Sequence, residues 1–235
     1  MRKVTSNEKK PIYWKNQKPP NPNEVFTDPL FPPTVNSLIG LDSSGKIIDD
    51  KNYNEKVKQI KKDKIEFYRP KDILGDDYCL FSDKIEFDDV KQGNLGNCYF
   101  ISSVASLCQF PDKIRKMFKQ TSKNEKGFYE IEFFIDGKKQ IVIVDDYIPA
   151  FKESKQPCYA RSVKKQIWVI LLEKAWAKVN GGYVYIIGGL NSEALEILIG
   201  RGSLQFDLRG KEGEELDNCK KKFLKRFNYL IKITP

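Results

Sequence analysis

Residues 92–100 read Gln-Gly-Asn-Leu-Gly-Asn-Cys-Tyr-Phe, and they are the most informative stretch for the fold. The glycines permit a tight turn, and the residues that follow, as far as Leu107, are dense in small and apolar side chains. We therefore expect a buried helix that is entered through Gly93 and Gly96 and has Cys98 among its first residues.

A cysteine at the start of a helix sits where the helix dipole and the free backbone N–H groups are positive. A thiol in that position ionises more readily, and the same N–H groups can bind an oxyanion. Gln92 lies six residues before Cys98 and can fold back to donate its side-chain amide. These are the parts that acyl transfer by a cysteine protease needs. The spacing also fits a second interpretation, in which Cys98 is a small buried apolar residue.

Two long elements are expected further along the chain. Alternating apolar residues over 128–135 and 140–144 flank Asp136-Gly137, which predicts a β-hairpin. Residues 167–179 return to helical spacing with one apolar stripe, and the glycine pair at 181–182 ends that helix.

Three shorter helices are also expected. One begins at Pro111, and one covers residues 192–199 with Asn191 or Ser192 as its cap. Residues 214–227 have the pattern of a last amphipathic helix.

Residues 1–40 differ in composition from the rest of the chain. Seven of the twelve prolines lie there, and residues 1–23 hold six Lys and Arg against one Glu. Because proline lacks an N–H and disfavours helix in the preceding residue, we expect residues 1–40 to be a basic extended arm without regular structure. Its apolar residues should pack on a core, and residues 41–235 should form the domain.

The overall composition excludes several classes of protein. The chain has 235 residues and no histidine, so no Ser-His-Asp triad, complete Cys-His pair or His-ligated zinc site can be assembled from it alone. The five cysteines are widely spaced, which argues against a disulfide framework. No apolar run is long enough to span a membrane and no secretory signal is visible, so we expect an intracellular, cytoplasmic protein.

The net charge of +9 favours an acidic partner. Nucleic acid, an anionic membrane surface and an acidic polymer such as a microtubule would all attract it. The alternative is a solubilising surface with a basic tail. Nucleic acid is not expected, because no zinc-finger spacing or aromatic RNA-binding strand is present.

Residues 92–100 strongly resemble the nucleophile motif of the calpain family, whose usual form is Q-G-x-L-G-D-C-W-F/L. Support comes, in the same order along the chain, from FTDPLFPP at 26–33, IEFYRP at 65–70, VDDYIP at 144–149, IWVILLEKAWAK at 167–178 and the glycine pair at 188–189. The resemblance spans about residues 25–230. It implies an α+β fold, the papain-like calpain protease core, of which this chain holds the first, mainly helical subdomain with a small antiparallel β-hairpin.

The resemblance also implies roles for three residues and a polypeptide substrate. Cys98 takes the place of the nucleophile, Gln92 that of the oxyanion-hole glutamine, and Gly189 that of a glycine that pairs with substrate backbone. The histidine and asparagine of the family lie in a second subdomain, before which this sequence stops. We therefore expect the chain to be inactive alone.

Calpain cores bind calcium in each half. The resemblance therefore implies a calcium site in this chain, but only some of the ligands match. Asp89 matches an aspartate ligand, with backbone carbonyls near Ser82 and Lys84, but the glutamate ligand of the family falls on Gln166. A glutamine carbonyl can ligate calcium but brings no charge, so we expect weak or absent binding. The other interpretation of Asp88-Asp89 is a solvated acidic turn. Further departures are Asn97 in place of aspartate and Tyr99 in place of tryptophan.

Two functions stay open at this point. The first is a calcium-dependent cysteine-type endopeptidase of which this chain carries the nucleophile half of the site. The second is a non-catalytic scaffold or binding protein in a larger intracellular assembly, with an acidic protein or a microtubule bound by the basic arm.

Overall fold

The computed structural model describes residues 17–40, 54–200, 210 and 212–222. The chain divides into two compact units, Met1–Arg201 and Gly202–Pro235. In the second unit a helix covers residues 213–222, which confirms the first part of the predicted last helix; the remainder lies outside the described residues. Over the described part of the chain, no helix is long and apolar enough to cross a membrane.

The predicted hairpin is the longest pair of strands in the first unit. Strand β3 (Phe128–Ile135) pairs antiparallel with β4 (Lys138–Asp145) along its whole length. Asp136 and Gly137 both have positive φ, 54° and 70°, which is the turn geometry that lets a two-residue loop match the strand twist. Alternate residues of β3 are buried, so one face of the hairpin belongs to the core.

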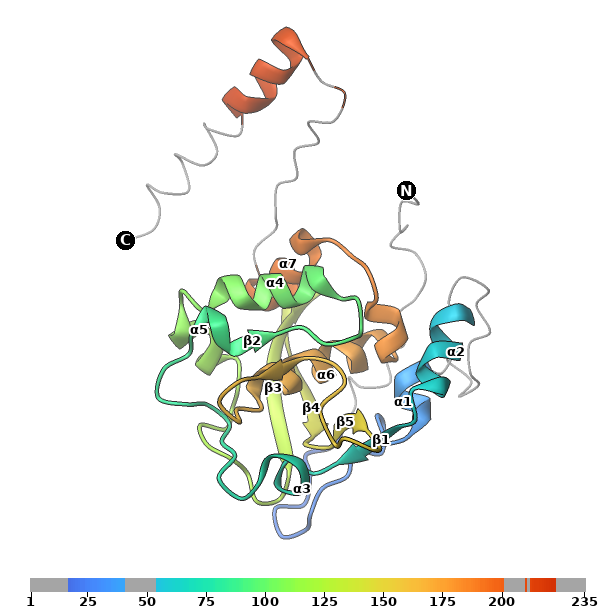
Figure 1. Ribbon diagram of the computed structural model, residues 1–235. Coiled ribbons are helices and arrows are strands. Elements are labelled where there is room, and N and C mark those ends of the chain that lie inside the picture. Colours follow the sequence, from blue (N-terminus) through green and yellow to red (C-terminus); the bar gives the residue numbers. More distant parts are fainter. Residues whose placement is uncertain (1–16, 41–53, 201–209, 211, 223–235) are drawn as a thin grey trace. The chain divides into compact units, whose positions relative to one another are not determined.

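Four α-helices are grouped around the hairpin, as Figure 1 shows. They are α4 (Cys98–Leu107), α5 (Pro111–Lys116), α6 (Trp168–Asn180) and α7 (Asn191–Ile199), with the 3-10 helix η3 (Tyr183–Ile186) between the last two. Helices α6 and α7 pack on the hairpin, and α4 packs on both of them. All residues of α6 from Trp168 to Val179 are buried, so this helix is the centre of the core.

Shorter elements complete the unit. They are α1 (Val35–Ile39), α2 (Asn54–Lys62), β1 (Ile65–Tyr68), α3 (Pro70–Leu74), η2 (Phe87–Asp89), β2 (Val90–Lys91), β5 (Ile148–Phe151) and β6 (Arg161–Ser162). β1 pairs with β5 and β2 with β6, both antiparallel. Helices and small antiparallel sheets, kept separate in this way, make the fold α+β, as predicted.

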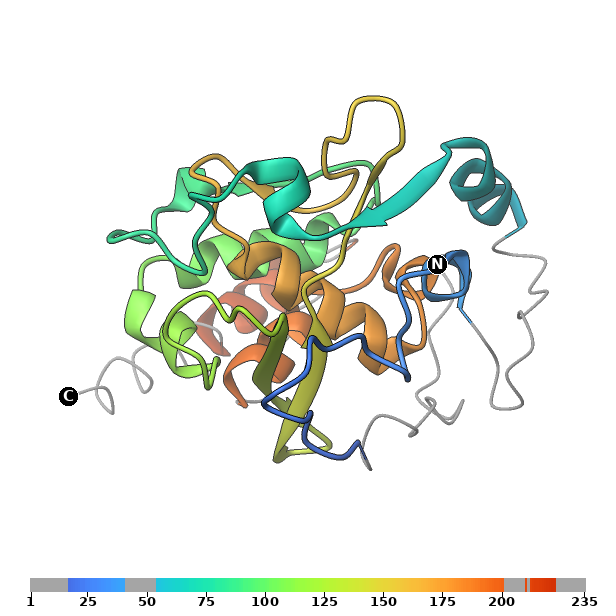
Figure 2. The ribbon, with the colours of Figure 1, turned by 90° about the horizontal axis from the view of Figure 1, so that it is seen from below.

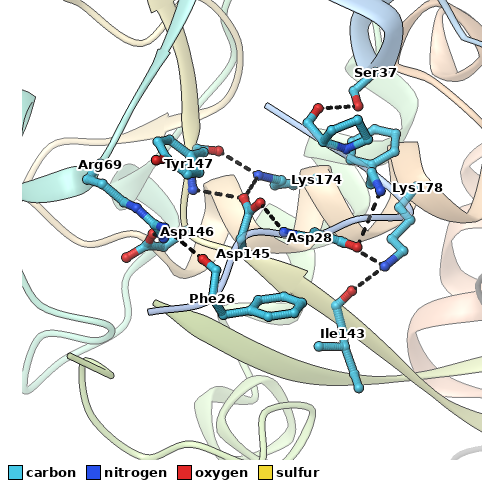
Figure 3. A network of polar contacts seen from close by, with 12 residues as sticks. Phe26, Asp28, Ser37, Arg69, Ile143, Asp145, Asp146, Tyr147, Lys174 and Lys178 are labelled. Carbon is cyan, nitrogen blue, oxygen red and sulfur yellow. Dashed lines mark hydrogen bonds and ion pairs between the residues drawn. The ribbon is translucent and has the colours of Figure 1, made fainter. Parts of the chain in front are cut away.

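The described part of the predicted arm, residues 17–40, is bound to the rest of the first unit by polar contacts (Figure 3). The backbone N–H of Phe26 donates to the Lys126 carbonyl at 2.8 Å, and the Arg69 guanidinium donates to the Phe26 carbonyl at 2.7 Å. Figure 2 shows this blue segment running beside the hairpin. Its apolar Phe31 is buried, in line with the expectation that the arm packs on a core. The domain boundary placed after residue 40 stays a prediction.

Two details of the sequence interpretation are wrong. Residues 35–39 form the helix α1, although no regular structure was expected before residue 41. The last proline of the arm is Pro33, so residues 35–39 contain no proline that would prevent a helical turn. Helix α7 begins at Asn191 and has Leu190 in the cap position, without a side-chain cap. The Asn191 amide instead donates to the Tyr99 carbonyl at 3.1 Å and to the Ser102 hydroxyl at 2.7 Å.

Candidate active site

The loop before α4 is fixed by its backbone. The N–H of Asn94 donates to the carbonyl of Cys158 at 2.9 Å. A side chain on Gly93 would lie 2.2 Å from the carbonyl oxygen of Tyr159 and 2.5 Å from that of Cys158, so only glycine allows this approach. Gln92 stands exposed at the beginning of this loop, directly after β2.

Cys98 is the first residue of α4, as the glycine pattern predicts. Gly96 has a φ of +74°, and its carbonyl accepts the N–H of Gly188 at 3.1 Å. The first backbone N–H groups of a helix have no acceptor within the helix. Cys98 lies at this end of α4, where the N–H groups of Phe100 and Ile101 donate to the Asn97 carbonyl at 2.9 and 3.2 Å.

The exposure of Cys98 separates it from two other cysteines. Its side chain is exposed, whereas Cys108 and Cys158 are buried. Burial raises the pKa of the Cys108 thiol to about 11 and lifts the pKa of Cys158 further. The interpretation of Cys98 as a buried apolar residue is therefore wrong.

Gly189 lies against the residue that follows the cysteine. A Cβ atom on Gly189 would come within 2.6 Å of the Tyr99 ring. The Tyr99 hydroxyl accepts the indole N–H of Trp176 at 3.0 Å, which ties the ring to α6. Burial raises the pKa of Tyr99 to about 12, so the phenol stays neutral. The structure thus brings the Cys98 end of α4 and the glycine pair at 188–189 together.

A buried carboxyl group that contacts the residue before the cysteine was not singled out from the sequence. Glu173 on α6 accepts the Asn97 side-chain N–H at 2.7 Å and the Ala160 backbone N–H at 2.9 Å. Burial raises the pKa of Glu173 to about 7, against the smaller opposing effect of these two donors. The sequence signals this residue only as an acidic side chain within an apolar helix. Because the whole helix is buried, Glu173 is buried with it.

Unpaired polar atoms surround this carboxyl group. Among the described residues, the buried Asn97 Oδ1 and the hydroxyls of Tyr159 and Tyr183 have no hydrogen-bond partner. The two tyrosine rings lie 4.9 Å apart between centroids. Buried polar atoms without partners are costly, so the packing around these three groups has to offset that cost.

The calcium candidates Asp89 and Gln166 are both buried, which excludes a solvated acidic turn at Asp89. Asp88, its neighbour, is exposed. The side-chain oxygen of Gln166 accepts two protein donors, the Ser82 backbone N–H at 2.9 Å and the Trp168 indole N–H at 3.1 Å. Among the described residues, no group of three or more His, Cys, Asp and Glu is placed to hold a metal ion.

Comparison with known proteins gives one consistent family. The family model described as "Calpain family cysteine protease" matches residues 26–232. The chain is 36% identical over 195 residues to the calpain-type cysteine protease ADL1 of Oryza sativa subsp. japonica, which covers 80% of this chain and 8% of the relative. It is 32% identical over 193 residues to Calpain-5 of Mus musculus, covering 78% of this chain and 27% of the relative.

This α+β domain has a cysteine at the start of a buried helix, and the family model matches most of the chain. It is a cysteine protease domain. More narrowly, the chain belongs to the calpain family. It spans between 8% and 27% of the length of these relatives, so it corresponds to a small part of each.

Proposed function

We propose that this chain supplies the nucleophile half of a calpain-type cysteine endopeptidase that acts on polypeptides. The observation that carries the proposal is the exposed Cys98 at the first position of α4. The fold assignment that goes with it is the first subdomain of a papain-like calpain core. The free cysteines, without a disulfide framework, suit a reducing intracellular setting.

Three residues have roles in this proposal. The Cys98 thiolate attacks the carbonyl carbon of the scissile bond. The developing oxyanion takes hydrogen bonds from the Cys98 backbone N–H and the Gln92 side-chain amide, as oxyanion donors do elsewhere. Gly189, exposed and with no side chain to obstruct it, offers its backbone to an extended substrate.

The second half of the chemistry needs a group that these 235 residues do not contain. Release of an amine from the tetrahedral intermediate requires a proton, which histidine gives in cysteine and serine proteases. With no histidine in the sequence, the proposal assigns that imidazole to another polypeptide or to residues beyond this sequence. The chain alone should form an acyl-enzyme but should not hydrolyse amides.

A p-nitrophenyl ester tests nucleophilic attack separately from protonation of the leaving group, because p-nitrophenolate leaves without being protonated. We expect a burst of p-nitrophenolate, at most one per chain, as a thioester forms on Cys98 and the ester C–O bond breaks. Cys98→Ala should abolish the burst. Gln92→Ala should slow it by about 10²–10³-fold if the full effect of an oxyanion donor is lost, whereas Asn94→Ala, exposed in the same loop, is the matched control.

Casein completes the test. The 235-residue chain should leave casein intact, like Cys98→Ala. Rapid casein cleavage that requires Cys98 would contradict the predicted inactivity, and a missing ester burst would contradict the nucleophile role itself.

A second candidate function is a non-catalytic binding module, which the lack of any imidazole in the sequence favours. Most of the basic residues assigned to binding an acidic protein or a microtubule precede residue 17, outside the described residues. Co-sedimentation with microtubules, lost at high salt, would support it. The intact mass of the native protein separates the two functions, since a mass well above 27.3 kDa favours the enzyme.

A further inference from the structure

The segment from Ser82 to Asp89 is held by two cationic side chains. Lys164, two residues after β6, forms ion pairs with Glu86 and with Asp89, the latter at 3.2 Å. Arg115 of α5 donates to the carbonyl oxygens of Ser82 at 2.8 Å and Asp83 at 3.1 Å. These contacts place positive charge on the segment that carries the candidate calcium ligands.

The acidic ligand is satisfied entirely by the protein. Asp89 is only 1% exposed; one carboxylate oxygen faces the Lys164 ammonium, and the other accepts the Glu86 backbone N–H at 3.0 Å. A buried carboxylate needs a counter-charge and hydrogen bonds, and this one has both. The pairing of β2 with β6 sets the register that brings Lys164 to it, because Val90 lies opposite Ser162.

The uncharged candidate ligands, which are the side-chain oxygen of Gln166 and the carbonyls of Ser82 and Lys84, also accept hydrogen bonds from the protein. The Gln166 side-chain oxygen holds two N–H donors, the Ser82 carbonyl holds Arg115, and the Lys84 carbonyl accepts the Ser82 hydroxyl at 2.5 Å. A calcium ion takes about six to eight oxygen ligands and would have to displace these donors. The donor set therefore does not fit calcium.

We propose that Lys164 occupies the position of a cation for Asp89, with Arg115 holding the adjoining carbonyls, so that this unit folds without calcium at this site. The cation is built into the chain, and no ion has to be bound to order the segment before Cys98. Because unfolding is the readout, the proposal stands or fails independently of the chemistry assigned to Cys98.

The test measures the melting temperature of the full 235-residue chain in EDTA and in a calcium series, with magnesium as the control ion. A ligand that binds only the folded state raises this temperature. We expect no calcium effect on the wild type. A calcium-dependent rise that Asp89→Asn removes would overturn the proposal.

Substitution of Lys164 gives the second part of the test. Lys164→Met should lower the melting temperature by several degrees and should gain a calcium-dependent rise, since Glu86 and Asp89 are then uncovered. Lys165→Met is the matched control, because Lys165 pairs only on the surface, with Asp77 at 2.7 Å. Lys164→Arg should retain most of the stability. Loss no greater than in Lys165→Met, or no calcium response in Lys164→Met, would overturn the proposal.

Discussion

The ammonium group of Lys178 lies 2.6 Å from the carboxylate of Asp28, which precedes it by 150 residues. Both side chains are fully buried. The same ammonium donates to the Ile143 carbonyl at 2.6 Å, and the Asp28 backbone N–H donates to Asp145 at 2.8 Å (Figure 3). Burial lowers the pKa of Lys178, which Asp28 opposes by stabilising its charge.

Removing one member of this pair should be severe. Asp28→Asn leaves a buried ammonium without its counter-charge, which costs about 3–5 kcal/mol in comparable buried pairs. Urea unfolding measures the change. Asp88→Asn, at an exposed carboxyl, is the control and should change the free energy of unfolding by less than about 0.5 kcal/mol. Equal losses in the two variants would contradict the importance of the pair.

The double variant sharpens this prediction. Lys178→Met should be destabilising on its own, but Asp28→Asn combined with Lys178→Met should cost less than the sum of the single changes, because neither charge is then left buried alone. Additive losses would mean that the two groups act independently.

Glu173 should make the stability depend on pH. The unfolded chain releases this proton near pH 4.5, whereas the folded chain keeps it until about pH 7. Between these values the folded state binds more protons, so the free energy of unfolding falls as pH rises, by up to about 3 kcal/mol. The neighbouring Cys158, Tyr159 and Tyr183 have raised pKa values and do not titrate in this window.

The isosteric variant isolates that contribution. Glu173→Gln cannot ionise, so the wild type should lose stability relative to it from pH 4.5 to about 7 in urea unfolding. Glu196→Gln, exposed on α7, should follow the wild type across the same range. Parallel curves for the wild type and Glu173→Gln would show that Glu173 is not held protonated by burial.

Gly189 should tolerate no side chain. In Gly189→Ala the new methyl group meets the Tyr99 ring, and overpacking of this kind costs about 1–3 kcal/mol. The displaced ring adjoins Cys98, so the ester burst should also slow. Gly137→Ala is the control: its φ is positive, so an added side chain strains the backbone, but nothing lies within 4 Å of its Cβ position, and it should lose stability without slowing the burst.

Cysteine exposure predicts the order of alkylation. Iodoacetamide, followed by peptide mapping, should modify Cys98 before the buried Cys108 and Cys158 in the folded chain. The order should disappear in denaturant. Modification of Cys158 at the rate of Cys98 without denaturant would contradict the burial of Cys158.

Elements with a strong local pattern could be predicted from the sequence. The hairpin follows from alternation around Asp136-Gly137, and α6 follows from one apolar stripe ended by Gly181. The two short sheets could not be found this way, because β1 and β5 are far apart in the chain and four residues long. Their pairing depends on the tertiary fold.

In the candidate site, too, only features with a local sequence signal could be predicted. Cys98 at the start of a helix could be predicted because glycines and a following apolar run are local signals. The contact of Asn97 with Glu173 joins residues 76 apart, and the ion pair of Lys164 with Asp89 depends on strand register. Neither leaves a local trace. The roles of Gln92 and Gly189 stay predictions.

The burial of Asp28 against Lys178 also has a consequence for synthesis of the chain. Asp28 leaves the ribosome long before α6, and until Lys178 has been made its carboxylate has no counter-charge to fold against. The same helix supplies Glu173 and Trp176 to the residues around the cysteine. Nascent chains that end before α6 therefore cannot close this core, and the nucleophile acquires its surroundings only when translation has passed that helix.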